Sequence, residues 1–394
     1  MSDPIQLRIP GPTPLPDAVR EASARQMINH RGPEFRALIK RVTERLQRAF
    51  RTTNDLFILT ASGTGGLEAA IVNHLSPGDP VLAVSIGSFG DRFGDIAQRY
   101  GAGVRRYSTE WGRAAEPTEM AQRLRAMADD GNPARALLLT HNETSTGIVN
   151  PLRELATAAR EASSETLIIV DGISGLGAVP FDADGWDLDV VVTGSQKSWM
   201  VPPGLAMISV STRAWSAASR ASMPRYYFDL GEAKSYLDKG ETPWTPAVSV
   251  VVALDVALEM IETEGYPQIF ARHAACAAAA RAGLAAMGFA PVAEPEHASD
   301  TVTAAWLPRD VEWSTLNREL LSRRLVLAGG QGQLAGQILR IGHLGAVTPA
   351  DIVRAIEIIE QGALAIGLPI DVGAGPREAQ LAGMLRPEAV PTPA

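Results

Sequence analysis

Short apolar runs rich in β-branched residues recur through the first two thirds of the chain. Runs at 56–60, 80–84, 136–140, 167–171, 189–194 and 205–210 are continuous enough to be strands buried on both faces. Between them, apolar residues at helical spacing predict helices at 33–50, 64–75, 116–129 and 151–163. This alternation predicts a mainly parallel sheet covered by helices, and ligands bind such sheets at the carboxyl ends of the strands.

The pattern changes beyond a long helix predicted at 247–264. Helices predicted at 267–287 and 349–366 flank short strands within 301–308 and 339–343, which indicates a smaller α+β domain. Prolines favour an extended start of the chain, and its end is too rich in Pro, Gly and Ala to build a core. We therefore expect an N-terminal arm at 1–20, a large domain at 21–264, a small domain at 265–370 and a flexible tail at 371–394.

Composition narrows the class of protein. At 394 residues the chain exceeds the size at which one core keeps growing, so two packed domains are expected. Its apolar runs are shorter than the roughly 20 residues that span a bilayer, so no membrane partner is expected. A net charge of −8 without a block of Lys and Arg does not suit a nucleic-acid surface.

Cysteine usage and the start of the chain indicate the compartment. Cys276 is the single cysteine, so it forms no internal disulfide, and the first residues lack the layout of a secretory signal. We therefore expect a cytoplasmic protein. Cys276 lies in an alanine-rich helical stretch, which favours a small buried residue over a nucleophile.

A glycine-rich turn at 60–68 joins a predicted strand to a predicted helix. Glycines let the backbone approach a ligand closely, and the free N–H groups at a helix start favour a phosphate. A turn of this kind also needs glycine for geometry alone, and neither the Walker pattern nor the dinucleotide fingerprint is present. The candidate phosphate-binding residues are Ser62, Gly63, Thr64, Gly65 and Gly66.

Two charged residues follow the next strands. Asp171 ends the run at 167–171, where its carboxylate must be solvated, pair with a cation or cap a helix. Lys197 follows the run at 189–194, among small and aromatic residues that can lower its pKa, although a lone loop lysine is more often solvated. With the glycine turn they supply the three contacts that pyridoxal phosphate (PLP) requires: a phosphate anchor, a pyridinium partner and an aldehyde partner.

With these features on one chain, the sequence resembles the class V PLP-dependent aminotransferases, specifically the alanine–glyoxylate and serine–glyoxylate (serine–pyruvate) branch. The likeness runs from GPTPLP through HRGPEF, ASGTGGLEAA, HNETSTGI, VDGISGLG, GSQKSW and TPWTPAVS to LRIGHLG. It implies the α/β fold of fold-type I PLP-dependent transferases, with a mainly parallel seven-stranded sheet in the large domain and a smaller C-terminal α+β domain. It also implies transfer of an amino group from alanine or serine to glyoxylate or pyruvate, with PLP as cofactor.

The resemblance assigns roles to individual residues. Lys197 would hold PLP as a Schiff base and then move the Cα proton, while Asp171 would pair with the pyridine nitrogen. Arg340 would grip the substrate α-carboxylate, and Gly11 would border the substrate. The further implied cofactor contacts are Phe89 stacked on the ring, Thr144 beside the ring oxygen, Ile173 on the opposite face, Gln196 near the phosphate, and Thr242 and Thr245 reaching the phosphate of a second subunit. A homodimer with shared active sites follows from the last pair, and no metal is implied.

Departures from the family pattern leave the amino donor open. Gly32 replaces a common serine in HRGPEF, and GPTP replaces the more frequent GPGP. Alanine, serine, ureidoglycine and aminoethylphosphonate remain candidate donors, whereas Gln331 replaces an arginine of the pyridoxamine–pyruvate subgroup. A cysteine desulfurase would need a histidine where Gln196 stands and a loop cysteine. A binding or regulatory protein would be marked by a lost lysine or an added DNA-binding domain, and the sequence has neither mark.

Overall fold

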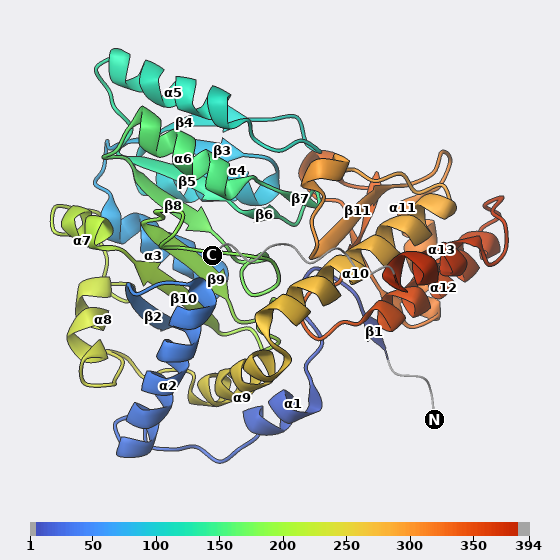
Figure 1. Cartoon of the computed structure of the whole chain (residues 1–394), viewed down its shortest axis with the longest axis horizontal. Helices are drawn as coiled ribbons and strands as arrows, with labels where there is room; N and C mark the ends of the chain where they lie inside the picture. Colours follow the sequence, from blue (N-terminus) through green and yellow to red (C-terminus); the bar gives the residue numbers. More distant parts are fainter. Residues whose placement is uncertain (1–4, 385–394) are drawn as a thin grey trace.

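Seven strands form the large sheet of the computed structural model, which describes residues 5–384 (Figure 1). Strand β10 runs opposite to the other six strands of this sheet, so the mainly parallel seven-stranded sheet is confirmed. In sheet order the strands are β2 (Asp55–Thr60), β10 (Leu205–Val210), β9 (Val190–Gly194), β8 (Leu167–Asp171), β5 (Ala136–Thr140), β3 (Pro80–Ser85) and β4 (Gly103–Ser108).

Helices cover both faces of this sheet, because successive strand residues point to opposite faces. In β5, Leu137 and Leu139 belong to one apolar core, whereas Ala136 and Leu138 belong to the other. The first core is completed by α2 (Pro33–Phe50), α5 (Pro117–Asp129), α6 (Leu152–Ala162) and α9 (Val248–Glu264). The second is completed by α3 (Gly63–His74), α4 (Ser88–Arg99), α7 (Thr212–Ala218) and α8 (Leu230–Leu237).

Some elements were not predicted because their sequences lack a strong period. Strand β4 is an edge strand whose residues are mostly exposed or half-buried, so it has no continuous apolar run. Helix α4 starts in a glycine-containing segment, SFGDRFGD, which resembles a loop. The unpredicted elements also include α7, α8 and α11 (Trp313–Ser322) and the short hairpin of β6 (Asn142–Glu143) and β7 (Ile148–Val149).

A second, smaller sheet lies beside the first in Figure 1, and helix α10 (Tyr266–Ala286) packs on it. It contains β11 (Val302–Trp306), β14 (Ile338–Gly342) and β13 (Ala328–Gly329), all antiparallel. Its own apolar core includes α10, α11 and α12 (Pro349–Ala365). The expected small α+β unit is therefore present, while the domain bounds at 264 and 370 stay a prediction.

The start of the described chain is extended and then helical. Strand β1 (Gln6–Leu7) pairs in parallel with β12 (Leu325–Val326) next to the small sheet. Helix α1 (Asp17–Ser23) begins inside the segment expected to be an arm up to residue 20, so the extended part ends earlier. The arm therefore joins the small sheet to the large-sheet unit. Residues 1–4 of the expected arm lie outside the described residues.

The expectation of a mobile tail from residue 371 is wrong for 374–384. These residues form helix α13 (Ala374–Met384), which packs on α10 and α12. Small residues allow the close approach: a Cβ added at Gly283 of α10 would lie 3.0 Å from the Ala379 Cβ. The buried Glu360 carboxylate accepts the N–H groups of Gly373 and Gly375 at the start of α13. Low hydrophobicity misled the prediction because close helix packing needs little side-chain volume. Residues 385–394 of the expected tail lie outside the described part of the chain.

Candidate active site

The carboxyl ends of the parallel strands meet at one edge of the large sheet, and the predicted site residues follow them. A Cβ added at Gly63, which starts α3 after β2, would lie 2.5 Å from Ile173 Cδ1, just beyond β8. A Cβ added at Gly194, the last residue of β9, would lie 3.5 Å from the Gly63 Cα. The glycine turn, the end of β8 and the end of β9 are therefore in contact, as the sequence predicts.

The start of α3 is open to an anion. Ser62 stands at the N-cap but makes no side-chain cap bond, and the first turn holds no acidic residue. The first N–H groups of such a helix have no partner within it and carry the positive end of the helix dipole. A Cβ at Gly66 would lie 2.6 Å from Val192 Cγ1, so glycine lets α3 pack directly on the sheet. Thr64 and Gly65 are half-buried between these positions.

The side chain of Gln196 has unused hydrogen-bonding capacity beside this turn. Its Oε1 is buried and finds no partner among the described residues. The same atom lies 3.1 Å from the position of a Cβ added at Gly194, which itself faces Gly63. An unpartnered buried polar atom is costly, so a ligand at the turn would satisfy this amide.

Asp171 ends β8 and is only 4% exposed. Its Oδ1 accepts the N–H of Ile173 at 2.9 Å. Burial raises the pKa of this carboxyl to about 7, helped by the charge of Glu143 and opposed by the Ile173 hydrogen bond and the charges of Lys197 and Arg92. A buried carboxylate of this kind is stabilised by a cationic hydrogen-bond donor such as a protonated ring nitrogen.

Lys197 lies in the loop after β9 and is hydrogen-bonded to the N-terminal arm. Its Nζ donates a hydrogen bond of 2.5 Å to the Pro10 carbonyl. Thr13 donates its N–H to the Gln196 carbonyl and its hydroxyl to the Lys197 carbonyl, each at 3.1 Å. Gly11, at φ +124°, leaves no room for a side chain, because a Cβ there would lie 2.8 Å from Lys197 Nζ. The arm therefore positions the lysine from the side that faces the small sheet.

Lys197 also differs from the other lysines of the chain. Burial lowers its pKa to about 8; the Asp171 charge opposes this change, while the charges of Arg340 and Arg92 add to it. A larger fraction of the amine is therefore neutral near pH 7 than in an ordinary lysine. The remaining lysines of the sequence, all exposed, are Lys40, Lys234 and Lys239.

Arg340 comes to the same place from β14 of the small sheet. It is 5% exposed, and burial lowers the pKa of its guanidinium. Nε donates to the Gly329 carbonyl and Nη1 to the Thr144 carbonyl, both at 2.9 Å. A guanidinium has five N–H donors, so three remain for a carboxylate. Thr144 is also buried, and its predicted contact beside the ring oxygen stays a prediction.

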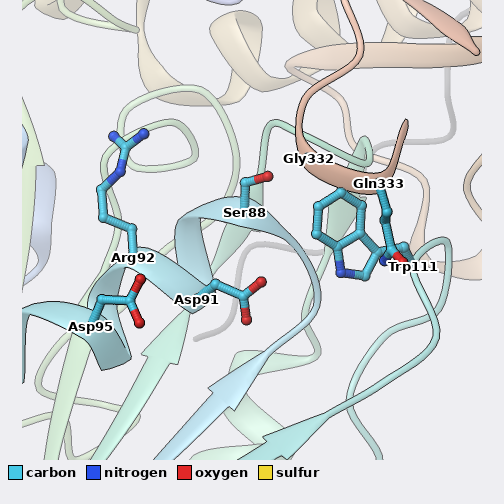
Figure 2. A pocket seen from close by; sticks show the side chains of 7 residues that line it. All are labelled: Ser88, Asp91, Arg92, Asp95, Trp111, Gly332 and Gln333. Carbon is cyan, nitrogen blue, oxygen red and sulfur yellow. The ribbon is translucent and has the colours of Figure 1, made fainter. Parts of the chain in front are cut away.

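Phe89 lies in the first turn of α4, beyond the end of β3. It is half-buried, and the Arg92 guanidinium lies 4.7 Å from the centre of its ring. An open cavity of about 490 Å³ adjoins this turn, lined by Ser88 and Arg92 of α4 and, opposite, by Trp111 and Gln333 (Figure 2). The cavity thus lies between the helix that carries Phe89 and the segment that precedes β14.

Thr242 and Thr245 lie apart from these contacts within the chain. Thr242 donates its hydroxyl to the Trp244 carbonyl at 2.7 Å, and Thr245 is exposed. The segment still borders the site, because the Ala247 N–H bonds to Thr60 Oγ1 at the end of β2 at 3.0 Å. Their predicted contact with a second subunit stays a prediction.

Sequence reasoning did not single out Glu143, Arg92 or Thr13. Glu143 and Thr13 lie inside segments quoted for the family likeness, and Arg92 follows Phe89 by three residues, so proximity in sequence was the available signal. For Glu143 the further clue is its residue type: an acidic residue in a buried hairpin must have partners.

Fold and site together define the architecture of fold-type I PLP-dependent enzymes, and comparison with known proteins agrees. The family model described as aminotransferase class-V matches residues 18–341, so this chain belongs to the class V aminotransferase family. The enzymes of this family depend on PLP. The family predicted from the sequence is therefore confirmed.

The relatives carry several names. The chain is 41% identical over 369 residues to a soluble hydrogenase 42 kDa subunit of Anabaena cylindrica, covering 93% of this chain and 95% of that one. It is 37% identical to an L-aspartate–glyoxylate aminotransferase of Paracoccus denitrificans, covering 94% of each. It is 36% identical to a serine–glyoxylate aminotransferase of Methylorubrum extorquens, covering 94% and 93%.

Solved structures are similar over nearly the whole chain. An alanine–glyoxylate aminotransferase from Nostoc sp. superposes with a TM-score of 0.86 at 30% identity, covering 92% of this chain and 96% of that one. Within residues 5–384, the helices are too short or too polar to cross a membrane. The cytoplasmic location expected from the sequence stays a prediction.

Proposed function

We propose that the protein is a PLP-dependent aminotransferase that moves the amino group of alanine or serine to a 2-oxo acid such as glyoxylate or pyruvate. One observation carries this proposal: a partly desolvated lysine lies within electrostatic reach of both a buried carboxylate and a buried arginine. The pKa of Lys197 responds to both Asp171 and Arg340. An amine, an acid and a carboxylate-binding group are what amino-group transfer from an amino acid requires.

The residues at this edge fit PLP. The open start of α3, with Thr64, would take the phosphate, and Gln196 would use its unpartnered amide there. Asp171 would pair with the ring nitrogen, while Phe89 and Ile173 would lie against the two ring faces. When bound, PLP supplies an electron sink for the carbanion that forms at the substrate Cα.

Lys197 would first hold the cofactor and then act as the general base. Its lowered pKa leaves a usable fraction of neutral amine near neutral pH, which a base needs to take the Cα proton. Asp171, kept anionic by the positive ring nitrogen, would maintain that charge during proton transfer. Lys197 would therefore move the proton at its Nζ, and the Asp171 carboxylate would stabilise the charge on the ring nitrogen.

Arg340 would fix the substrate by its α-carboxylate. Three unused N–H donors allow a two-bond contact, and burial strengthens it by excluding water. The contact sets the direction of the Cα–H bond relative to Lys197. Gly11 beside the lysine adds backbone without side-chain bulk, which suits a donor held close to Nζ.

The proposed enzyme is a homodimer in which Thr242 and Thr245 reach the phosphate of the partner's site. An aromatic surface beside these residues supports this part of the proposal. Tyr226 is 75% exposed and stacks on Trp244 at 5.0 Å between ring centres, an unusual placement for solvent-facing rings. Trp244→Ala is expected to shift the sedimentation profile from dimer toward monomer at a given concentration. An unchanged profile, or a wild type that sediments as a monomer, would contradict it.

A half-reaction screen tests the function directly. The purified protein is saturated with PLP, mixed with single amino donors, and followed by the loss of the PLP absorbance as the pyridoxamine form accumulates. We expect conversion by alanine or serine and recovery by glyoxylate or pyruvate. Aspartate, ureidoglycine, aminoethylphosphonate and pyridoxamine are included, and a faster reaction with any of them would replace the proposed donor. Release of sulfide from cysteine without amino transfer would indicate a lyase instead.

A further inference from the structure

Glu143 is a fully buried carboxylate in the β6–β7 hairpin, between the helix that carries Phe89 and the arginine from the small sheet. Its Oε2 accepts the backbone N–H groups of Phe89 and Gly90, each at 3.0 Å. Its Oε1 accepts the N–H of Ser145 at 3.0 Å and the Ser145 hydroxyl at 2.6 Å. All four partners are donors, so both carboxylate oxygens are satisfied as acceptors. Burial raises the pKa of this carboxyl, and these hydrogen bonds oppose that change.

The hairpin thereby caps the start of α4. The Ser88 N–H, next in line, donates to Ser145 Oγ at 2.9 Å. Three successive N–H groups of the first turn are thus bonded to two side chains from another element, and the negative charge faces the positive end of the helix. Gly87 makes room for this arrangement, because a Cβ there would lie 2.4 Å from Ser145 Oγ and 2.6 Å from Glu143 Cγ.

The same hairpin reaches the substrate side of the site. Thr144, between Glu143 and Ser145, offers its carbonyl to Arg340 Nη1 at 2.9 Å. The charge of Glu143 opposes the lowering of the Arg340 pKa by burial, so the carboxylate lies close enough to interact with the guanidinium. One buried side chain therefore ties together the backbone of Phe89 and the backbone that holds Arg340.

We propose that Glu143 is a positioning residue that sets the two sides of the active site relative to each other. Through α4 it fixes Phe89 against the cofactor ring, and through the Thr144 carbonyl it fixes Arg340 for the substrate carboxylate. Glu143 contacts neither ligand itself. The proposal rests on the proposed aminotransferase function, because it assumes a ring at Phe89 and a carboxylate at Arg340.

Glu143→Gln is the most conservative test. An amide keeps the size of the side chain but replaces one oxygen by an NH2 group. In either orientation this NH2 group would face backbone N–H donors in place of an acceptor oxygen. Either the first turn of α4 or Ser145 then loses its acceptor, and an unmatched buried donor makes the observed geometry unfavourable. We expect the dissociation constant of PLP to rise roughly ten-fold or more, together with a similar rise in the KM for the amino donor.

The chain offers a matched control in Glu360. It is 5% exposed and also accepts two backbone N–H groups at a helix start, those of Gly373 and Gly375, but it lies in the core of the small α+β unit. Glu360→Gln should lower the melting temperature as Glu143→Gln does, because both leave a buried donor unmatched. It should leave PLP affinity and KM at their wild-type values.

The deciding measurement is PLP affinity of the cofactor-free protein, by equilibrium dialysis, in wild type, Glu143→Gln, Gly87→Ala and Glu360→Gln. Gly87→Ala keeps the charge but displaces Glu143 and Ser145 sterically, at an extended φ of 164° that alanine tolerates. Weaker PLP binding in the first two variants and normal binding in the control is the expected result. Wild-type affinity and KM in both folded variants would overturn the proposal.

Failure of folding and failure of the proposed function give different results. Should Glu143→Gln not fold, Ser145→Ala decides in the same assay, because it removes only the hydroxyl bonds to Glu143 and Ser88. Wild-type PLP affinity in that variant and in Gly87→Ala would then overturn the proposal. A wild-type protein that does not bind PLP would instead contradict the proposed function, whatever the variants do.

Discussion

Lys197 and Pro10, 187 positions apart in sequence, are joined by a 2.5 Å hydrogen bond from the lysine Nζ to the proline carbonyl. The bond lets the N-terminal arm hold the amine at the edge of the sheet where the other site residues lie. The arm is also bonded to the small sheet, because the Gly342 N–H donates to the Arg8 carbonyl at 2.7 Å. The lysine, the arm and the strand that carries Arg340 therefore form one connected unit.

Gly11→Ala is expected to displace the side chain of Lys197 in addition to straining the backbone. Its Cβ would lie 2.8 Å from Lys197 Nζ, so the amine must leave its position. Gly78→Ala is the matched control, because Gly78 also has a positive φ, of +88°, but an added Cβ there meets nothing within 4 Å. Both variants should lose roughly 1 kcal/mol of stability through the strained backbone. Only Gly11→Ala should slow the capture of PLP. Equal capture rates in the two variants would contradict the role of the N-terminal arm in positioning Lys197.

The rate of PLP capture by the cofactor-free protein should depend on pH through Lys197. A lysine whose pKa is lowered to about 8 loses its proton there, so capture should rise through pH 8 and level off well below the ordinary lysine pKa of 10.5. Asp171 raises the pKa of this amine, so Asp171→Asn should move the midpoint to lower pH. A midpoint near 10.5 in the wild type, measured by stopped-flow absorbance, would mean that Lys197 is not desolvated.

Asp171→Asn should stabilise the cofactor-free protein while impairing the enzyme. The folded-state pKa of Asp171, about 7 against 3.8 for an ordinary aspartate, means that the folded protein holds its proton more tightly. Wild-type stability is thus lost as pH rises from about 4 to 7, by roughly 4 kcal/mol from this group. In the asparagine variant, the free energy of unfolding measured with urea should not show this decrease between pH 4 and pH 7. With PLP bound, it should turn over much more slowly, and an unchanged turnover rate would remove Asp171 from the pyridinium role.

Arg340→Ala should distinguish substrates by their carboxylate. We expect the KM for L-alanine in the half-reaction to rise roughly ten- to hundred-fold, the value of charge-assisted hydrogen bonds to a carboxylate. Ethylamine has no carboxylate, so its slow reaction should change little. Arg340→Lys keeps the charge but not the planar fork and should lie between the two. Equal losses for alanine and ethylamine would show that the arginine only supports the Thr144 and Gly329 carbonyls.

Two substitutions in α13 test its packing. Ala379 is buried against α10, whereas Gln380, next to it, is exposed. Ala379→Glu buries an unpaired charge and should lower the melting temperature by several degrees, since it costs at least ~1–3 kcal/mol. Gln380→Glu adds the same charge on the solvent side and should change little. Equal melting temperatures of the two variants would show that residues 374–384 do not pack on the rest of the protein.

Much of this structure follows from the sequence because its strands are continuous apolar runs and its helices are long and periodic. Asp171 and Lys197 could be placed at one sheet edge, since carboxyl ends of parallel strands coincide. Glu143 could not, because its role depends on a hairpin of two-residue strands that has no period of its own. Helix α13 was missed for a related reason: its stability comes from close packing of Ala and Gly, which composition does not reveal.

The central claim is that Lys197 is the residue that holds PLP. Mixing the protein with PLP, reducing it with borohydride and mapping the peptides by mass spectrometry locates the modified lysine. At stoichiometric PLP we expect the phosphopyridoxyl mass on Lys197, and its loss in Lys197→Ala, because the other lysines, Lys40, Lys234 and Lys239, are exposed. A modification on one of those three, or equal labelling of the Lys197→Ala variant, would contradict the account.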